Sequence, residues 1–478
     1  MLRALSIVPV PVTILIISIL CPTEFSLFIG GLRLPPNRLA LLILLPIAIM
    51  RLMSARSVKP HAFDYVFLIF GFMTLFVYAM HAGKDGLIYG GSVALECLGG
   101  YFVARAYVRT PEMLHQTLRV MLLTICIAAL IALPEFLFGQ NFTHDILRQL
   151  TGYNHPTAVQ TRLGLTRAYG TFDHPIHYGT FCASMLALLM YAERKRAVRR
   201  KRAALVVGAT FLGLSSAPLL SLALQAALIA WDRTTRAIAA RISITAAALV
   251  GLYLAVDLVS SRSPLAIMAT RLTLDTWTGY YRLFIWEHGM TNVWANPWLG
   301  LGLADWARPW WMVADTIDAY WLVLAMRQGI PSFLLLVLGI GLLIRATVVN
   351  RRHLADADAR NMLRGWTMSL VALCMIGSTV HYWNVLHTYM FFLIGLGGVF
   401  ADPVRQKVSR KIKAARATIT EPPPHGGVSG PRPLQPPPVH ARAPMDPRPQ
   451  ARPSTTPPPI PGMLPPPLPA GFRGRGNR

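Results

Sequence analysis

The run GIPSFLLLVLGIGLLIRATVVNRR, residues 329–352, determines the class of fold. It carries no charge over residues 329–344 and then ends in the basic residues Arg345, Arg351 and Arg352. A helix needs about 20 mostly apolar residues to span a bilayer, and somewhat fewer when flanking basic side chains reach the interface. The run is therefore predicted to cross a membrane, with its basic end on the cytoplasmic side.

The overall composition fits a chain made of many such segments. Of the 478 residues, 54% are hydrophobic and only 14% are charged, whereas about a quarter of the residues of a soluble domain are charged. The 46 Lys and Arg residues still outnumber the 21 Asp and Glu residues and give a net charge of +25. In a soluble protein this excess would indicate a nucleic-acid partner, but in a membrane protein it collects in cytoplasmic loops. We therefore expect a membrane protein that binds no nucleic acid.

Breaking the chain at its charge clusters gives twelve apolar stretches. One region, 203–231, allows either a single long helix or a tight hairpin that turns at residues 215–218. The hairpin is preferred because it keeps the basic run 194–202 and Arg233 on the same, cytoplasmic side. The predicted fold is an all-α polytopic transmembrane protein of about twelve helices. Their centres lie near Ile14, Leu44, Ile69, Ala94, Ile127, Ser184, Gly208, Ala223, Leu249, Val337, Leu373 and Leu393.

The charge pattern also orients the chain. With the N-terminus inside, most basic clusters lie on the cytoplasmic side, at 51–59, 105–119, 345–364 and in the C-terminal tail. Two long segments, about 139–173 and 257–327, lie outside and form the large outer loops. The first apolar run precedes Pro22, Thr23 and Glu24, which do not resemble a small-residue cleavage site, so we expect no cleavable signal. Both termini are predicted to be cytoplasmic.

The composition changes abruptly from about Asp402. The last 77 residues hold 21 of the 37 prolines, in runs such as PPP at 422, 436, 457 and 465. The chain is thus divided into a membrane domain, 1–401, and a disordered, proline-rich cytoplasmic tail, 402–478. This tail carries 13 basic and 3 acidic residues. It is predicted to bind the surface of anionic membrane lipid or to dock a partner with a proline-binding groove.

The two outer segments carry arginine and no lysine. Arginine presents a planar fork that binds phosphate bidentately and keeps its charge, so it can hold a phosphorylated group without a metal. The alternative is that several of these arginines pair with acidic residues and fasten the loops. The eight arginines are Arg148, Arg162, Arg167, Arg262, Arg271, Arg282, Arg308 and Arg327.

The first outer segment ends in RAYGTFDHPIHYGTF, residues 167–181. Pro175 suits the first turn of a membrane helix, with Asp173 or His174 as its N-cap. His177 follows about one helical turn later and is expected to face the same side. Both imidazole rings are candidates to donate hydrogen bonds to a phosphate or a sugar, and capping is the structural alternative for His174.

The second outer segment contains GYYRLFIWEHGMTNVWANPWLGLG (279–302) and then DTIDAYWLVLAMRQG (315–329). Its many tryptophans fit either sugar stacking or a membrane-interface belt. Asp315 and Asp318 are three residues apart and are expected on one helical face, with Tyr320 nearby. Either carboxylate is a candidate base for a sugar hydroxyl. The alternative is that one of them caps a helix.

No motif for a nucleotide or a metal accompanies these residues. The sequence has no Walker-type or dinucleotide glycine loop. DADAR, residues 356–360, has an Asp-x-Asp spacing but is interpreted as a solvated charge run in a short cytoplasmic loop. The five cysteines form no CxxC pair. We therefore expect neither a cofactor nor a metal.

These pieces together resemble the O-antigen ligase and polymerase superfamily of bacterial envelope glycosyltransferases, over about residues 1–400. The resemblance rests on the order, spacing and topological side of three pieces. The first is RAYGTFDHPIHYG, at the end of the first outer segment. The second, in the second outer segment, is an arginine followed by a tryptophan and then NPWLGLG, and the third is TIDAYWLVLAMRQGIPSF. It implies an inner-membrane protein with a large periplasmic loop that transfers undecaprenyl-diphosphate-linked glycans, with loss of the lipid diphosphate. Other polysaccharide assembly proteins are the partners that it suggests for the tail.

The resemblance implies that Arg167 takes the place of an arginine that grips the diphosphate and that Arg282 is the second loop arginine. From the residues themselves we further expect Arg162 to join this clamp, with His174 and His177 as further donors. The expected catalytic residues are Asp318, Arg282 and Tyr320, with Asp318, helped by Tyr320 or His174, orienting or deprotonating the acceptor hydroxyl.

The chain departs from the family in two places. Ligases that attach glycan to lipid A core have His-Asn where this chain has Asp318 and Ala319, and a common Ser-Arg turn is Ser216 and Ala217 here. The first departure favours a polymerase of exopolysaccharide or O-antigen repeat units over a ligase. A lipid-linked glycan flippase, with Glu96, Glu135 and Gln225 as its few membrane-embedded polar candidates, and a non-enzymatic scaffold are the other open classes.

Overall fold

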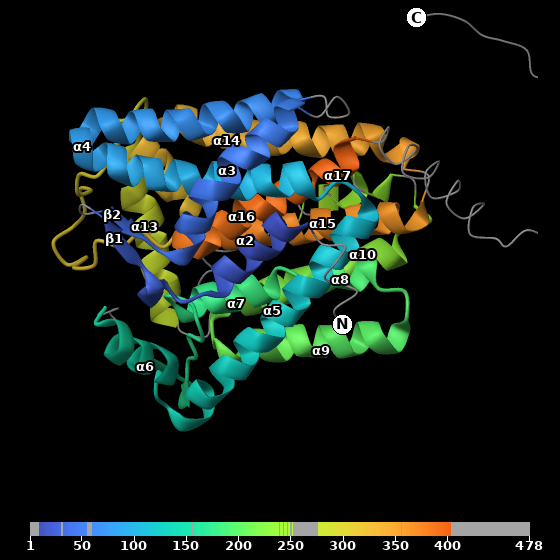
Figure 1. Cartoon of the computed structure of the whole chain (residues 1–478), viewed down its shortest axis with the longest axis horizontal. Helices are drawn as coiled ribbons and strands as arrows, with labels where there is room; N and C mark the ends of the chain where they lie inside the picture. Colours follow the sequence, from blue (N-terminus) through green and yellow to red (C-terminus); the bar gives the residue numbers. More distant parts are fainter. Residues whose placement is uncertain are drawn as a thin grey trace, which may run out of the picture. The chain divides into compact units, whose positions relative to one another are not determined.

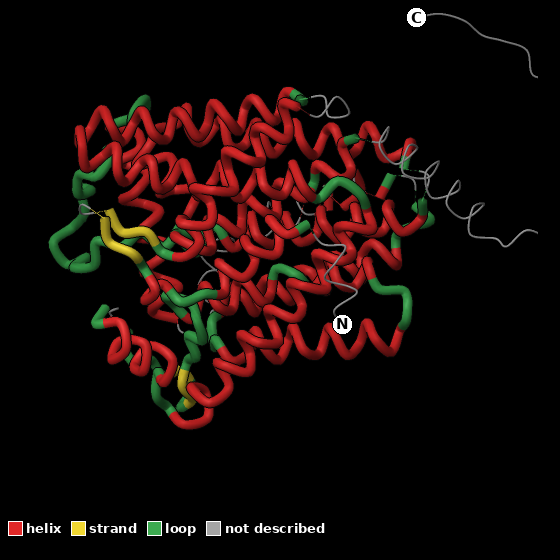
Figure 2. The backbone as a smooth tube through the Cα atoms, viewed as in Figure 1, coloured by secondary structure: helices red, strands yellow, loops and turns green. Residues whose placement is uncertain are grey.

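The computed structural model describes residues 9–29, 32–54, 60–153, 157–238, 276–354 and 356–402, together with 240–241, 243–245, 247–248 and 251. All of them belong to one unit, Met1–Thr418. This unit is mostly helical and has two short β-hairpins (Figure 1, Figure 2). Its helices are α2 (Val10–Leu20), α3 (Pro36–Ser54), α4 (Ala62–Tyr107), α5 (Pro111–Phe138), α6 (Phe142–Thr151), α7 (Pro175–Ala183), α8 (Leu186–Ala192), α9 (Arg196–Leu212), α10 (Ser216–Thr234), α13 (Thr276–Ala295), α14 (Tyr320–Asn350), α15 (Ala357–Ile376), α16 (Asn384–Leu396) and α17 (Gly398–Ala401), with the 3₁₀ turns η1 (Thr23–Phe25) and η2 (Arg351–His353).

The strands form two antiparallel pairs. β1 (Leu27–Ile29) pairs with β2 (Leu32–Leu34), and β3 (Thr161–Arg162) pairs with β4 (Leu165–Thr166). Both hairpins lie in connections between helices, where Figure 2 draws them in yellow. The second hairpin carries Arg162 and leads directly into Arg167.

Among the residues that the structure describes, five segments are long and apolar enough to cross a membrane, which supports the predicted class of helical membrane protein. The last of them is 94% buried, whereas the other four are 22% to 39% buried. It contains α16, which contacts α2, α3, α4, α7 and α15 (Figure 1). The five segments are Pro36–Ser54, Ala62–Tyr107, Pro111–Phe138, Tyr320–His353 and Asn384–Ala401.

Helix α4 is a hairpin of two predicted stretches. Its backbone leaves helical geometry at Ala82 and Gly83, so the second arm returns along the first. The far ends of the arms are joined by Arg105, whose Nε donates to Asp64 Oδ1 at 3.0 Å. The predicted centres Ile69 and Ala94 therefore lie in separate arms, as expected from the charges between them.

Glycine allows α4 and α16 to approach closely. A Cβ added to Gly100 would lie 2.3 Å from the carbonyl oxygen of Thr388, and one added to Gly395 would lie 2.4 Å from that of Tyr101. Small residues at helix crossings provide the packing contacts that hold helices together in lipid. Their presence on both helices explains why α16 is enclosed.

The region 203–231 forms two helices, which confirms the hairpin and excludes a single long helix. The turn lies at residues 213–215, earlier than predicted, because 216–218 already form the first turn of α10. The stretch centred on Ser184 is interrupted there, between α7 and α8. The side chain of Gln225 hydrogen-bonds to backbone groups on both sides of this break. It accepts from the N–H of Ala187 at 2.9 Å and donates to the carbonyl of Ala183 at 2.8 Å. The centre at Leu249 lies outside the described residues.

The segment 257–327, which is predicted to lie outside, contains a helix, α13, which packs on α14. The loop after α13, which includes NPWLGLG, is bonded to the start of α14. The N–H of Leu301 donates to Met326 O, and that of Ile330 donates to Pro297 O. Gly329 has a φ of +81°, and a Cβ there would lie 2.1 Å from the oxygen of Trp298. Only glycine fits this crossing of loop and helix.

Candidate functional site: an arginine-lined cavity

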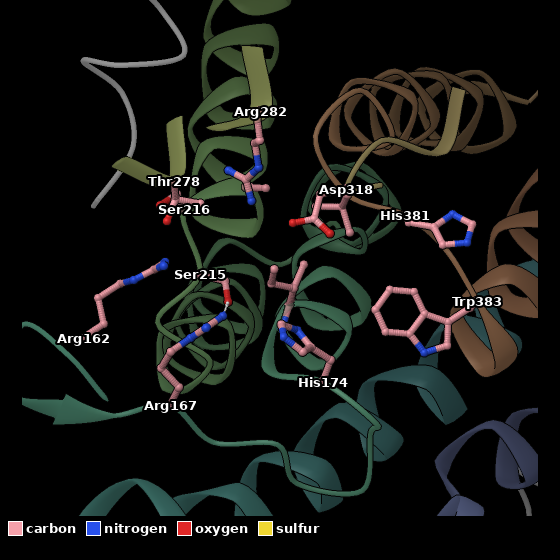
Figure 3. Close-up of a pocket in the computed structure, with 13 residues that line it drawn as sticks. Arg162, Arg167, His174, Ser215, Ser216, Thr278, Arg282, Asp318, His381 and Trp383 are labelled. Atoms are coloured by element: carbon pink, nitrogen blue, oxygen red, sulfur yellow. Dashed lines mark hydrogen bonds between the residues drawn. The ribbon is translucent and has the colours of Figure 1, made fainter. Parts of the chain in front are cut away.

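Residues from five separate parts of the chain enclose one cavity of about 200 Å³. They come from the loop before α7, the turn between α9 and α10, the start of α13, the loop before α14, and the loop between α15 and α16. Figure 3 shows the polar side chains that surround the space. We call it the arginine cavity, and it is lined by Arg162, Arg167, His174, Ile176, Ser215, Ser216, Ala217, Thr278, Arg282, Asp318, Val380, His381 and Trp383.

The cavity lies at the helix ends that are remote from the basic clusters. α10 begins at the cavity and has Arg233 in its last turn. α14 begins two residues after Asp318 and runs on to η2, which carries Arg351 and Arg352. α15 runs the opposite way, from a start near Arg360 toward the cavity. Because basic clusters mark the cytoplasmic side of membrane helices, this geometry agrees with a site on the outer side.

Arg167 is held rigidly at the cavity wall. It is 6% exposed, its Nη2 donates to Ser215 Oγ at 2.8 Å, and its Nη1 donates to Gln160 Oε1. Arg162 lies beside it, with Nη1 donating to the carbonyl of Leu214 at 3.3 Å. Burial and the neighbouring charge of Arg162 lower the pKa of Arg167 to about 10, so it remains charged at neutral pH. Within the described ranges, neither arginine forms an ion pair with a carboxylate.

Arg282 supplies a third guanidinium from α13 and is 8% exposed. Figure 3 shows it across the cavity from Arg167, with Asp318 close by. Burial raises the pKa of Asp318, and the charge of Arg282 opposes this shift. The site thus combines three permanent cations with one carboxylate that is a stronger base than an exposed aspartate.

The histidines at the cavity are neutral donors. His174 caps α7, because its Nδ1 accepts from the N–H of Ile176 at 3.1 Å, and this confirms the capping role that the sequence suggested. In the neutral ring the proton then sits on Nε2. Burial, followed by the charges of His177 and Arg167, lowers the pKa of His174 to about 3, and burial likewise lowers that of His381 to about 3. These rings can therefore donate a hydrogen bond, but they add no charge.

Two of the predicted site residues lie behind the cavity wall. His177 is fully buried, and its Nε2 lies 3.1 Å from the carbonyl oxygen of His381. Tyr320 is the first residue of α14, and its hydroxyl lies 3.2 Å from His387 Nε2. Neither lines the cavity, so both are placed to support the residues that do.

The expectation that Asp315 and Asp318 share a helical face is wrong. Both precede α14, whose N-cap is Ala319, so neither aspartate caps that helix. No helix forms over residues 313–319, and Ala319 has an extended backbone with φ −154° and ψ 107°. Ile317 is buried, whereas Asp318 is half-buried. The indole Nε1 of Trp306 donates to the carbonyl of Asp315 at 3.0 Å and holds this non-helical segment. Asp318 faces the arginine cavity as a result, and Asp315 does not line it.

The alternative, that arginines pair with acidic residues and fasten the loops, holds for two other members of the set. Arg148 lies 3.4 Å from Asp145, and Arg308 lies 2.6 Å from Asp305. Arg327 donates to the carbonyls of Gly302 and Ala304. The arginines therefore divide into three at the cavity and three that fasten loops, while Arg262 and Arg271 lie outside the described residues. Asp356, in the DADAR run, caps α15, where it accepts from the N–H of Asp358 at 3.2 Å.

Sequence reasoning missed several lining residues. His381 and Trp383 lie in the short connection between α15 and α16, and Ser215 and Thr278 lie beside the arginines. The connection 377–383 was a signal that could have been used, because the predicted topology already put it on the outer side. A histidine and a tryptophan in such a short outer turn are available to a site formed by the neighbouring loops.

The fold and the cavity define a class: a helical membrane protein with a cluster of buried and partly buried arginines and one carboxylate at the ends of its helices. Neither protein-family models nor curated proteins match the chain. Its activity is therefore inferred from the cavity and from the resemblance carried by the motifs that form it.

Proposed function

We propose that the protein polymerises undecaprenyl-diphosphate-linked repeat units into an exopolysaccharide or O-antigen at the periplasmic face of the bacterial inner membrane. The observation that carries the proposal is the meeting of Arg162, Arg167 and Arg282 with Asp318 around one cavity. Arg167 and Arg282 are buried, and Arg162 is partly buried. Like charges around one cavity repel one another and are costly to desolvate, so an added anion would stabilise the cluster. A diphosphate supplies that anion and has oxygens for several guanidinium forks.

The proposed topology has about twelve spans, with both termini in the cytoplasm and the loops around 139–173 and 257–327 in the periplasm. Support comes from the direction of α10, α14 and α15, which carry arginines at the ends away from the cavity. An extracytoplasmic diphosphate that approaches such a site from within the membrane is that of a lipid carrier. The proposal therefore needs neither a nucleotide nor a metal as cofactor.

The proposed reaction is a displacement at the anomeric carbon of the lipid-linked sugar. An acceptor hydroxyl oxygen forms the new glycosidic bond while the bond from the anomeric carbon to the diphosphate oxygen breaks. The lipid diphosphate leaves with the electron pair, and Asp318 takes the hydroxyl proton. Arg162, Arg167 and Arg282 stabilise the leaving charge, and a well-placed donor of this kind typically contributes about 2.7–4 kcal/mol.

Asp318 is proposed as the base because it is the carboxylate that lines the cavity. Burial raises its pKa, which strengthens it as a proton acceptor. His174 presents its Nε2–H as a neutral donor to the diphosphate or the sugar. Tyr320 and His177 keep a supporting role, since each is hydrogen-bonded behind the wall.

The polymerase is preferred to a ligase because Asp318 and Ala319 replace the His-Asn pair of lipid A core ligases. A flippase is less well supported, since all three of its candidate polar residues have structural partners. Glu96 Oε1 accepts from Arg38 Nε at 2.7 Å. Glu135 accepts from the N–H groups of Tyr169 and Gly170, and Gln225 satisfies the break between α7 and α8. The proline-rich tail, 402–478, is proposed to contact membrane lipid or other polysaccharide assembly proteins.

The test in cells is the substitution Asp318→Asn, which keeps the shape of the side chain and removes the base. Polymer length is measured on extracted polysaccharide at equal protein level. We expect loss of long chains and accumulation of single lipid-linked units. Polymer chains of normal length in this variant would show that Asp318 is not catalytic. A product one unit long on another lipid would identify a ligase.

A further inference from the structure

A second cavity adjoins the arginine cavity and shares part of its wall. Its volume is about 370 Å³, and Asp318, His381 and Trp383 line both cavities. We call it the tyrosine cavity. Its remaining lining is formed by Tyr78, Tyr89, Leu303, Asp315, Thr316, Ile317, Val323 and Arg327.

The chemistry of the tyrosine cavity differs from that of its neighbour. Tyr78 and Tyr89 come from the two arms of the α4 hairpin, and their ring centroids lie 4.9 Å apart in an edge-to-face arrangement. Tyr89 is 45% exposed, so part of its ring faces the open space. The guanidinium of Arg327 is already engaged by the carbonyls of Gly302 and Ala304. Aromatic faces, hydroxyls and two carboxylates, rather than a cluster of cations, suit a neutral polyhydroxylated ligand.

The position of Asp318, between the two cavities, indicates which cavity holds which substrate. In a displacement the acceptor hydroxyl must reach the anomeric carbon from the side opposite the leaving diphosphate. If the arginine cavity holds the diphosphate, the anomeric carbon lies next to Asp318, in the shared wall. The opposite side is then the tyrosine cavity, from which a hydroxyl can reach both the carbon and the carboxylate.

We propose that the tyrosine cavity is the acceptor site and binds the terminal sugar of the glycan that is to be extended. The proposal rests on the proposed polymerase function, and it adds the location of the second substrate. Tyr89 provides a face for the sugar ring, and Asp315 accepts hydrogen bonds from its hydroxyls. Asp318 then receives the proton of the one hydroxyl that attacks, and the lipid diphosphate leaves through the arginine cavity.

The experiment uses the purified full-length chain in lipid nanodiscs. The donor is lipid-diphosphate-linked repeat unit, isolated from host cells that lack this protein, and the acceptor is the same repeat unit freed of lipid. The variants are Tyr89→Ala and Asp315→Asn. Tyr65→Ala is the matched control, because Tyr65 is a 55% exposed tyrosine of the same helix that does not line the cavity.

We expect KM for the free acceptor to rise at least about fivefold in both variants, which corresponds to about 1 kcal/mol of lost binding. The affinity for undecaprenyl diphosphate, measured by intrinsic tryptophan fluorescence, and kcat at saturating acceptor are expected to stay unchanged. The Tyr65→Ala control is expected to match the wild type. An unchanged acceptor KM, or an equal loss of donor affinity, would overturn the proposal.

The outcomes separate this proposal from the one on which it rests. If the wild type forms polymer and the variants keep the wild-type acceptor KM, the acceptor site is wrong and the polymerase stands. If the wild type neither transfers glycan nor binds undecaprenyl diphosphate, the polymerase itself is wrong. Thermal unfolding of each variant verifies folding, and Tyr89→Phe, which keeps the ring, is expected to restore the acceptor KM.

Discussion

Replacing Arg167 with glutamine removes one buried cation from the arginine cavity. The guanidinium is fixed before any ligand arrives, because Ser215 Oγ and Gln160 Oε1 accept its hydrogen bonds. A preorganised donor of this kind typically contributes about 2.7–4 kcal/mol to a transition state, or about 10²–10³ in rate. We therefore expect kcat/KM for the lipid-linked donor to fall by about 10²–10³ in Arg167→Gln.

The structural cost of the same change is expected to be smaller. Each lost hydrogen bond costs about 1 kcal/mol, and relief of the repulsion between Arg167 and Arg162 offsets part of this loss. The assay is release of undecaprenyl diphosphate in single turnover, with thermal unfolding measured on the same sample. Arg167→Lys, which keeps the charge and loses the planar fork, is expected to lie between wild type and Arg167→Gln.

Arg308→Gln is the matched control, because Arg308 pairs with Asp305 outside the cavity. This pair is partly exposed and away from the cavity, so Arg308→Gln is expected to lower stability rather than rate, and its effect on rate should be within about twofold. A rate for Arg167→Gln within threefold of the control would refute an electrostatic role for Arg167 at the leaving group.

Three further predictions concern pH, the loop and the tail. Because burial raises the pKa of Asp318, kcat/KM should fall as the pH falls through that raised value. His174→Gln should leave this fall at low pH in place, since the pKa of His174 is about 3. A flat pH profile of donor release, or a fall at low pH that disappears in His174→Gln, would contradict the assignment of Asp318 as the base. Gly329→Ala should destabilise the protein by about 2 kcal/mol or more, seen as a lower Tm, whereas Gly341→Ala in the same helix, where a Cβ meets nothing within 4 Å, should leave Tm unchanged or higher. Deletion of residues 403–478 should leave polymerisation by the purified protein intact, and loss of activity in a well-folded truncated chain would favour the scaffold class instead.

The helices were predictable because each apolar stretch ends at charges or at turn-forming residues. Ile69 and Ala94 were assigned to separate stretches, and they occupy the two arms of the α4 hairpin. The exact ends were less predictable, as at 213–215, where the turn precedes the expected one. The break at Ser184 was not predicted, because it depends on Gln225, whose amide bonds to the backbone on both sides of the break.

The candidate site was predictable in its residue types and less so in its members. Arginine in outer loops indicated Arg162, Arg167 and Arg282, which line one cavity, but the same signal also marked Arg148 and Arg308, which fasten loops. Which arginines converge depends on the packing of distant segments. Spacing alone does not contain that information.

The conformation around Asp318 was predicted wrongly for a similar reason. A three-residue spacing fits a helical face only if the segment is helical, and here Trp306 holds it outside the helix through the carbonyl of Asp315. The closeness of Tyr320 to Asp318 in the sequence predicts that its hydroxyl lies at the site. The first turn of α14 instead directs its hydroxyl to His387.

The most direct measurement of the central claim uses the purified full-length protein and lipid-diphosphate-linked repeat units, with no nucleotide added. The products are separated by size after release from the lipid. The account predicts a ladder of glycans at multiples of the repeat unit, together with released undecaprenyl diphosphate, and no ladder with Asp318→Asn. Intact donor and no ladder, from wild-type protein that is folded, would contradict it.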